Sequence, residues 1–437
     1  MKTLTALDIG TTKISVLMIS YEEQNVMKMM GYGTAPARGV KKGVIVDIDQ
    51  VTECIDEALQ KAERMSGVSS KQMVTAVGGP HITSQDSHGV VAVANPKGDI
   101  VGSDIERVID AAKAISIPPT RYVLTVSPRQ FVVDGQGEIR NPMGMSGVRL
   151  EVDCNIVTAS ATNLRNIERV LQSLEVTHDG FVFSAASSGY AVTSDNEREM
   201  GVLVIDVGGG KTDYAVFIDN ALSYAASIPV GARHITSDLA VGLGMPLDTA
   251  EELKLFISKA YSLGPHGKAM DLPDISEYLA KGDAADYTAK TVFEGIIALR
   301  LEEIFQMIYN DLEEKGYHKL VPAGIVLTGG GARTIGATEI AKHIMRVPVR
   351  VGTPFAPGTL LASARMTGVT DDLSHPIFAT VAGLLIAHGM EITKEKSGNL
   401  MQFMQHSLES VRGTKTSSTG PNRIFEKLKE IITQFLP

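Results

Sequence analysis

Two distant segments of the chain share one pattern, and this repeat constrains the fold more than any other feature. LTALDIGTTKISVLMI (residues 4–19) and VLVIDVGGGKTDYAVFI (residues 202–218) both read as apolar strand, Asp, apolar residue, Gly, two small residues, Lys and a second apolar strand. Aligned without a gap, Asp8 matches Asp206, and Lys13 matches Lys211. The separation is far too long for a solenoid repeat. The repeat therefore predicts an α/β protein in which two similar domains face each other across a cleft.

The loop inside each repeat is suited to binding phosphate. GGGKT at 208–212 ends like a Walker A loop, but Ile205 stands where that motif needs its first glycine, and a strand follows in place of a helix. A tight turn between two strands instead exposes consecutive backbone N–H groups to phosphate oxygens, and glycine lets the backbone approach closely. A third loop, VLTGGGART at 326–334, lies between a strand and a helical stretch and suits the adenosine side of a nucleotide.

These loops predict a site for ATP and Mg²⁺. An Asp at the end of the strand before each loop can hold a hydrated Mg²⁺ or orient a water, so Asp8 and Asp206 are predicted to bind the metal through water. Asp206 is also the catalytic candidate. For Lys211 two positions stay open, beside the phosphates or in solvent. The predicted nucleotide-binding residues are Asp8, Gly10, Thr11, Thr12, Lys13, Gly208, Gly209, Gly210, Lys211, Thr212, Gly231, Gly329, Gly330 and Gly331.

Composition excludes several other classes of protein. The net charge of −9 argues against a nucleic-acid binder, which would need a basic face. The two cysteines, Cys54 and Cys154, are too few and too far apart for a disulfide framework or a zinc site. No run of 18 apolar residues occurs, and the first residues lack a signal-peptide pattern. A cytoplasmic protein is expected.

Changes in the residue pattern along the chain divide it into six parts. Short alternating strands with one helix fill an apparent insert, helices dominate a later segment, and polar sequence separates the body from a final short helix. The predicted parts are 1–82 with 161–196 and 366–395 (first core subdomain), 83–160 (inserted subdomain), 197–235 with 320–365 (second core subdomain), 236–319 (outer helical subdomain), 396–421 (flexible linker) and 422–437 (amphipathic helix).

The order of these motifs resembles the actin, Hsp70 and sugar-kinase superfamily. Within it, RGVKKGVIVDID (38–49), NPMGMSGVRLE (141–151) and AGIVLTGGGA (323–332) are similar to the FtsA family, and the resemblance covers residues 4–390 and the terminal helix. It implies an actin-like two-domain ATPase fold with duplicated strand–loop–strand cores, an FtsA-type inserted outer subdomain and a C-terminal amphipathic helix.

The resemblance also implies further site residues. AEELK at 250–254 is similar to the helix whose Glu and Lys bracket the adenosine, here Glu251 and Lys254, although spacing alone also fits an ordinary i,i+3 charge pair. The helix IIALRLEEIFQMI (296–308) is similar to one that contacts FtsZ, which points to Arg300 and Glu303. An ion pair between these two residues alone is the equally open alternative.

The function implied is that of an actin-like cell division protein. It would bind ATP, self-associate into filaments on the cytoplasmic face of the cell membrane at the division site, tether the C-terminal segment of FtsZ and help recruit later divisome proteins. The alternatives are a sugar-kinase-like phosphotransferase and an Hsp70-like chaperone ATPase. Ser184 stands where relatives that hydrolyse ATP carry Glu or Gln to position the attacking water. The resemblance therefore implies slow hydrolysis at most.

The last 16 residues, NRIFEKLKEIITQFLP, have the periodicity of an amphipathic helix. Arg423, Lys427, Lys429, Glu426 and Glu430 lie on its polar side. We expect this helix to bind membrane lipid from the end of the linker. The residues of its apolar face are Ile424, Phe425, Leu428, Ile431, Ile432, Phe435 and Leu436.

Overall fold

The structure is a computed structural model, and it describes residues 2–21, 26–95, 98–115, 117–262, 272–279, 287–364 and 366–387. All of these lie in one unit, residues 1–398. The predicted linker (396–421), the terminal helix (422–437) and the seven apolar residues predicted to contact the membrane lie outside the described residues.

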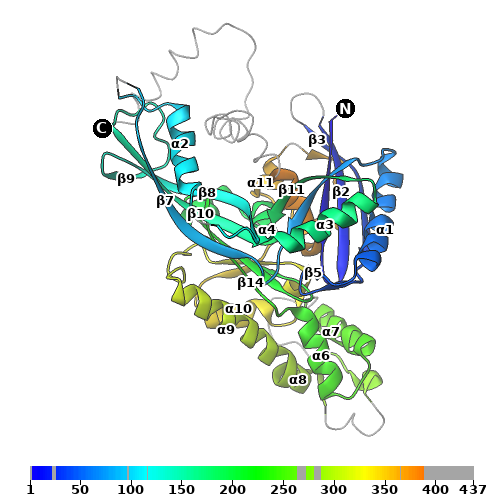
Figure 1. The fold of residues 1–437 in the computed structure, drawn as a ribbon. Helices are drawn as coiled ribbons and strands as arrows, with labels where there is room; N and C mark the ends of the chain where they lie inside the picture. Colours follow the sequence, from blue (N-terminus) through cyan, green and yellow to red (C-terminus); the bar gives the residue numbers. More distant parts are fainter. Residues whose placement is uncertain are drawn as a thin grey trace, which may run out of the picture. The chain divides into compact units, whose positions relative to one another are not determined.

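The first lobe is a six-stranded sheet with helices on both faces (Figure 1). A hairpin of β1 (Lys2–Ile9) and β2 (Lys13–Tyr21) forms its centre, and β6 (Gln72–Val77) runs parallel to β1. Next to these lie β3 (Met27–Pro36), β11 (Thr177–Phe183) and the short β17 (Met366–Thr367). The covering helices are α1 (Ile48–Ser66), α3 (Ala161–Ser173), α4 (Ser184–Val192) and α11 (Leu360–Ser363).

Helix α1 shows how local sequence fixes these elements. Asp47 caps its start by accepting the Gln50 N–H at 3.0 Å, and Gly67, at φ 70°, ends it in the left-handed conformation. Val51, Ile55 and Leu59, which are four residues apart in the sequence, are buried on one face of the helix.

The second lobe repeats the central arrangement of the first. Its five strands are ordered β14-β13-β12-β15-β16. The hairpin of β12 (Val202–Val207) and β13 (Thr212–Ile218) corresponds to β1 and β2, and β15 (Ile325–Thr328) runs parallel to β12 as β6 does to β1. The edges are β14 (Ala221–Ile228) and β16 (Val349–Val351). The duplicated strand–loop–strand core is therefore confirmed.

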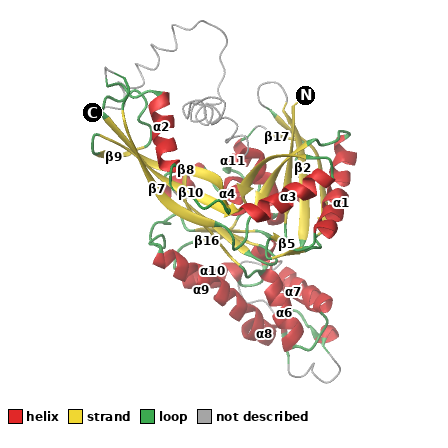
Figure 2. Ribbon diagram, viewed as in Figure 1, coloured by secondary structure: helices red, strands yellow, loops and turns green. Residues whose placement is uncertain are grey.

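A helical region extends from the second lobe (Figure 2). Its buried residues, among them Ile235, Leu253, Leu301 and Ile304, join the core of the second sheet. The helices are α6 (Ala232–Gly242), α7 (Leu247–Ser262), α8 (Ala289–Val292), a π-helical turn (Phe293–Ile297) and α9 (Ala298–Glu314), followed by α10 (Ala337–Met345). The short α5 (Asp195–Met200) precedes β12, and β4 (Val40–Lys41) pairs with β5 (Val44–Ile45).

The insert has its own sheet and its own core. The strand order is β7-β10-β8-β9, and α2 packs against β7 and β10, burying Ile105 and Val108 against Leu150 and Val152. The elements are β7 (Thr83–Ala92), α2 (Gly102–Lys113), β8 (Arg121–Val133), β9 (Gln136–Ile139) and β10 (Arg149–Ser160). The chain enters and leaves it from the first lobe. The predicted boundaries of the six parts remain predictions.

Although it is spliced into the first lobe, the insert also contacts the second lobe. Its strands lie alongside β14 (Figure 1). Arg129 donates to the Tyr317 hydroxyl at 3.1 Å, and Arg140 pairs with Glu199 at 2.9 Å and with Asp219. No helix among the described residues is long and apolar enough to cross a membrane.

Candidate nucleotide site

The two repeated loops form the same turn. The Gly10 N–H donates to the Lys13 carbonyl at 3.0 Å, and the Gly208 N–H donates to the Lys211 carbonyl at 3.0 Å. A Cβ at Gly10 would stand 2.5 Å from Lys13 O, which explains the glycine. The backbone of each loop is thus closed on itself, and its tip is free to face the other lobe.

The tips of the two loops are in contact across the cleft. A Cβ at Gly210 would lie 2.7 Å from Cγ2 of Thr11, and one at Gly209 would overlap Cγ2 of Thr12. The Thr11 hydroxyl is buried and has no hydrogen-bond partner in the described structure. A buried hydroxyl without a partner costs free energy, so this atom fits a site that an oxygen-rich ligand completes.

Hydrogen bonds from the start of helix α6 hold the second loop in place. The Ala232 and Arg233 N–H groups donate to the carbonyls of Gly208 and Gly209 at 2.9 and 2.8 Å. Gly231 is required because a Cβ there would overlap Gly208 O. Gly231 thus allows the close approach that positions the loop, and its predicted contact with the nucleotide stays a prediction.

The third loop closes the site from the second lobe. Gly329 has φ 82°, and a Cβ there would also overlap Oδ1 of Asp206. Gly331 packs on Val207 and Ala232, whereas a Cβ at Gly330 would make only an ordinary contact with Ile377. As predicted, the loop follows a strand and precedes a helix, with a short 3-10 turn (Gly330–Arg333) between them.

A cavity of about 830 Å³ lies between the lobes, within the size range of ligand sites. Six of the predicted residues line it: Thr12, Gly209, Glu251, Lys254, Gly330 and Gly331. The other predicted residues support the loops. Thr212, for example, is buried and donates to the Val230 carbonyl at 2.8 Å, and Lys13 donates to the Ile377 carbonyl at 3.1 Å with its ammonium 4.0 Å from the centre of the Phe378 ring.

Glu251 and Lys254 face the cavity as a bonded pair. The Lys254 ammonium donates to Glu251 Oε2 at 2.7 Å and to the Thr236 hydroxyl at 3.0 Å, and Thr236 donates to Glu251. The i,i+3 ion pair of the alternative interpretation is present, and it lies on the cavity wall. The charge pair is therefore confirmed, whereas the bracketing of adenosine by Glu251 and Lys254 stays a prediction.

Buried carboxylates lie at the ends of β1 and β12, next to the two glycine loops. Burial raises the pKa of Asp8 to about 6, and burial also raises the pKa of Asp206. Burial lowers the pKa of Lys13 to about 8. No group of three or more His, Cys, Asp or Glu side chains among the described residues is placed to ligate a metal. Asp8 and Asp206 remain the residues predicted to hold a hydrated Mg²⁺.

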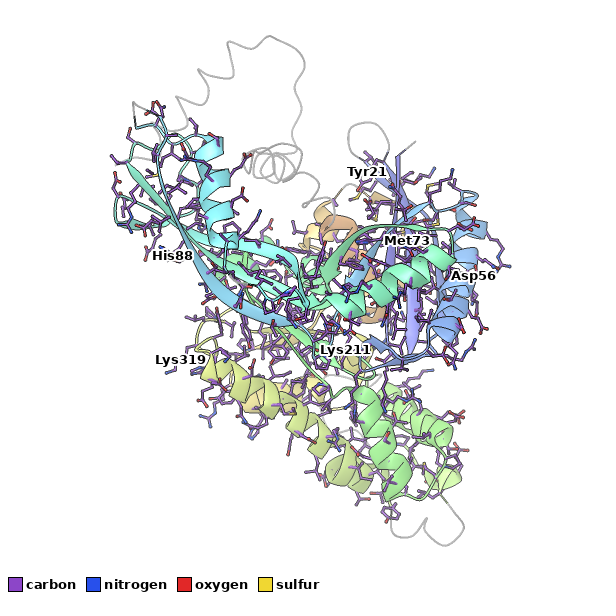
Figure 3. The ribbon with its side chains drawn as sticks, in the orientation of Figure 1. Tyr21, Asp56, Met73, His88, Lys211 and Lys319 are labelled. Atoms are coloured by element: carbon purple, nitrogen blue, oxygen red, sulfur yellow. The ribbon has the colours of Figure 1, made fainter. Side chains whose placement is uncertain are left out.

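Lys211 does not point to solvent, so that half of the sequence interpretation is wrong. Its side chain is only 13% exposed, and its ammonium pairs with Asp213. Burial acts to lower the pKa of Lys211, but the ion pair raises it above its ordinary value. The Lys211 side chain turns toward the first lobe, at the centre of Figure 3, where the two lobes meet.

Asp206 is held by hydroxyl groups that sequence reasoning missed. Its Oδ2 accepts from Ser188 at 2.6 Å and from Thr380 at 2.8 Å. Ser184, predicted at the water-positioning place, is buried at the start of α4, one turn before Ser188. A serine one helical turn after Ser184 lies on the same face, which is the signal that identifies Ser188.

Other missed residues line the cavity with positive charge. Arg233 and Arg333 both face it, and Arg333 contacts Nε2 of His375 at 2.7 Å. A basic residue directly after a glycine loop, as in GGGAR, could have identified Arg333. Thr236, which joins Glu251 to Lys254, has no such signal in the sequence.

Arg300 lies away from the nucleotide site, where α9 meets α6. It donates to both carboxylate oxygens of Asp238, at 2.7 and 3.0 Å, and it also pairs with Glu303. The ion pair with Glu303 is therefore confirmed, but Asp238 is a second partner that was not predicted. Val241, 85% exposed, follows Asp238 by three residues, and Leu299, 56% exposed, immediately precedes Arg300.

Two lobes with matching hairpins, facing loops and a cavity between them define an actin-like ATPase fold. The fold is similar to that of a chain in the solved PilM–PilN type IV pilus biogenesis complex, with a TM-score of 0.62 at 15% sequence identity. The match covers 88% of this chain and 98% of that one. Against MreB5 of Spiroplasma citri bound to ADP, the TM-score is 0.51 at 13% identity, covering 91% of this chain and 99% of that one.

Sequence comparisons identify the family. Residues 79–158 match the family model "SHS2 domain inserted in FTSA", and residues 203–383 match "Cell division protein FtsA". The chain is 34% identical to cell division protein FtsA of Pseudomonas aeruginosa (98% of this chain, 97% of the relative) and 35% identical to that of Bacillus subtilis (80% and 78%). The chain belongs to the FtsA family: it is an actin-like cell division protein. Sugar-kinase and chaperone functions are therefore not favoured.

Proposed function

We propose that this chain binds ATP with Mg²⁺ between its lobes, self-associates on the cytoplasmic face of the cell membrane at the division site, and tethers FtsZ there while other divisome proteins join. The pair of facing glycine loops, with the unpartnered Thr11 hydroxyl between them, is the observation that carries ATP binding. Membership of the FtsA family supports the tethering role.

The direct test reconstitutes the proposed assembly. Purified protein, vesicles containing anionic lipid and FtsZ filaments are mixed with ATP and centrifuged. We expect FtsZ to sediment with vesicles only when this chain is present. FtsZ that stays in the supernatant, while the chain itself binds both ATP and vesicles, would contradict the tethering role.

We expect the chain to hydrolyse ATP slowly. Ser184 is too short to hold a water in line with the γ-phosphate, and the Ser188 hydroxyl is already bonded to Asp206. Phosphate release from purified protein should be at least a hundredfold below the roughly 10 s⁻¹ typical of enzymes. Asp206→Ala serves as the control, because turnover that this variant retains comes from a contaminant. Fast turnover that Asp206→Ala abolishes would show that another group positions the water.

For FtsZ docking we propose the outer helical region, with Arg300 as a contact. Exposed Val241 and Leu299 and the basic Arg300 suit an acidic, partly apolar peptide. Arg300→Glu should weaken FtsZ peptide binding at least about tenfold by placing like charges together. The substitution also sets a second carboxylate against Asp238, so the control is the exchange Arg300→Glu with Asp238→Arg, which keeps an ion pair between α6 and α9. Unchanged peptide affinity in folded Arg300→Glu protein would exclude Arg300 as a contact.

A further inference from the structure

Lys211 and Asp213 form a charged pair buried where the second lobe meets the first. The Asp213 side chain is 2% exposed, and its Oδ1 accepts the Gly79 N–H at 3.0 Å. A Cβ at Gly43 would lie 2.6 Å from Cδ of Lys211, and a Cβ at Gly78 would overlap both charged groups. Glycines of the first lobe thus make room for a cation that the phosphate loop of the second lobe supplies.

This cation stands beside an excess of carboxylates. Lys211 directly follows the three glycines of the second loop, and Asp8 and Asp206 lie at the ends of the strands that lead into the two loops. Together with Lys13 and Asp213, these residues place three carboxylates and two ammonium groups at the two loops, so the ionised cluster has a net charge of −1. Without Lys211 the net charge would be −2, and Asp213 would be buried without its cation.

A nucleoside polyphosphate brings several negative charges to this cluster. Where water is excluded, like charges repel strongly, and an unpaired buried carboxylate is costly. A divalent cation ordinarily offsets such repulsion in phosphate sites. A permanent cation on the loop itself would offset part of this repulsion, so that less of it has to be offset by the divalent ion.

We propose that Lys211 is the resident counter-cation of the phosphate site, and that it lets this protein hold a nucleoside polyphosphate with little help from Mg²⁺. The inference rests on the proposed ATP site and adds the source of its charge balance. A purely mechanical role of the Lys211–Asp213 pair, as a latch between the lobes, makes a different prediction. Loss of either partner would then weaken nucleotide binding alike.

The test compares ATP affinity in Mg²⁺ and in EDTA for the parent, Lys211→Thr, Asp213→Asn and the double variant, by isothermal titration calorimetry. In EDTA, Lys211→Thr should bind at least about tenfold more weakly, because Asp213 then repels the phosphates. Asp213→Asn should bind at least about threefold more tightly, because Lys211 loses its partner and keeps its charge. The double variant should return to within about threefold of the parent, and Mg²⁺ should shrink all of these differences.

The direction of the affinity change in each variant distinguishes the counter-cation role from the latch role. If Asp213→Asn binds ATP in EDTA as weakly as Lys211→Thr, and the double variant is no better, the pair is a latch and the inference is wrong. Should Lys211→Thr fail to fold, as circular dichroism will show, Asp213→Asn decides alone: tighter binding in EDTA supports the inference, and equal or weaker binding overturns it. A parent protein that binds no ATP even with Mg²⁺ would overturn the proposed site itself.

Discussion

Gly209→Val is expected to lower ATP affinity at least about a hundredfold, and Gly209→Ala at least about tenfold. A Cβ at this position overlaps Cγ2 of Thr12 on the opposite loop, so even one methyl group drives the two phosphate loops apart. Valine also fills the space in which the phosphates would lie. Calorimetric titration with ATP and Mg²⁺ measures the effect.

The matched control is Gly330→Ala in the third loop. It lines the same cavity, but its Cβ would meet only Cγ2 of Ile377, at 3.7 Å, which is ordinary contact. We expect less than about a threefold change in ATP affinity there. Equal losses at both positions, or unaltered affinity in Gly209→Val, would refute the assignment of the facing loops as the phosphate site.

Phe425→Glu is expected to abolish vesicle binding while ATP binding stays at the parent level. The helix predicted over 422–437 has seven large apolar residues on one face, each worth roughly 1.5–3 kcal/mol when fully buried. Ordering the helix and confining the chain offset much of this sum, so a charge on this face leaves too little for attachment. Three basic and two acidic residues give the polar face a charge of only +1, and lipid charge therefore compensates little.

Gln434→Glu is the matched control, because it adds the same charge to the polar face of the helix. Co-sedimentation with vesicles should be close to that of the parent. The predicted linker of residues 396–421 has a mean reach of about 25–30 Å, so one tail binds weakly and several tails on one filament bind tightly. Phe425→Glu protein that still pellets with vesicles would show that attachment lies elsewhere.

The hairpins and glycine loops could be predicted from the sequence, because the glycines, the Asp residues and the apolar alternation that specify them lie close together in the chain. The two hairpins, their turns and the third loop follow from residues within a few positions of one another, as Gly10 with Lys13 and Gly208 with Lys211 show. Gly231 was predicted only as a nucleotide-binding residue, and its close approach to the Gly208 carbonyl could be seen only in the fold.

Side chains whose partners are remote in sequence were not predictable. Asp213 follows the loop by three residues, yet its partner is the N–H of Gly79 in the other lobe. Thr380 reaches Asp206 from the far end of the chain, and Asp238 reaches Arg300 across two helices. In each case the periodicity of the helix or strand predicts the side of the element on which the side chain lies. Which residue it contacts depends on how the elements pack together in the fold.

The contacts between the insert and the second lobe have a mechanical consequence. The insert is joined to the first lobe by two covalent connections, yet Arg129 and Arg140 tie it to Tyr317, Glu199 and Asp219 of the second. It is a cross-brace between the two lobes. Any rotation of one lobe against the other must break these ties or carry the brace along. A small angular change at the loops then becomes a larger linear displacement at the tip of β9, as at the end of a lever.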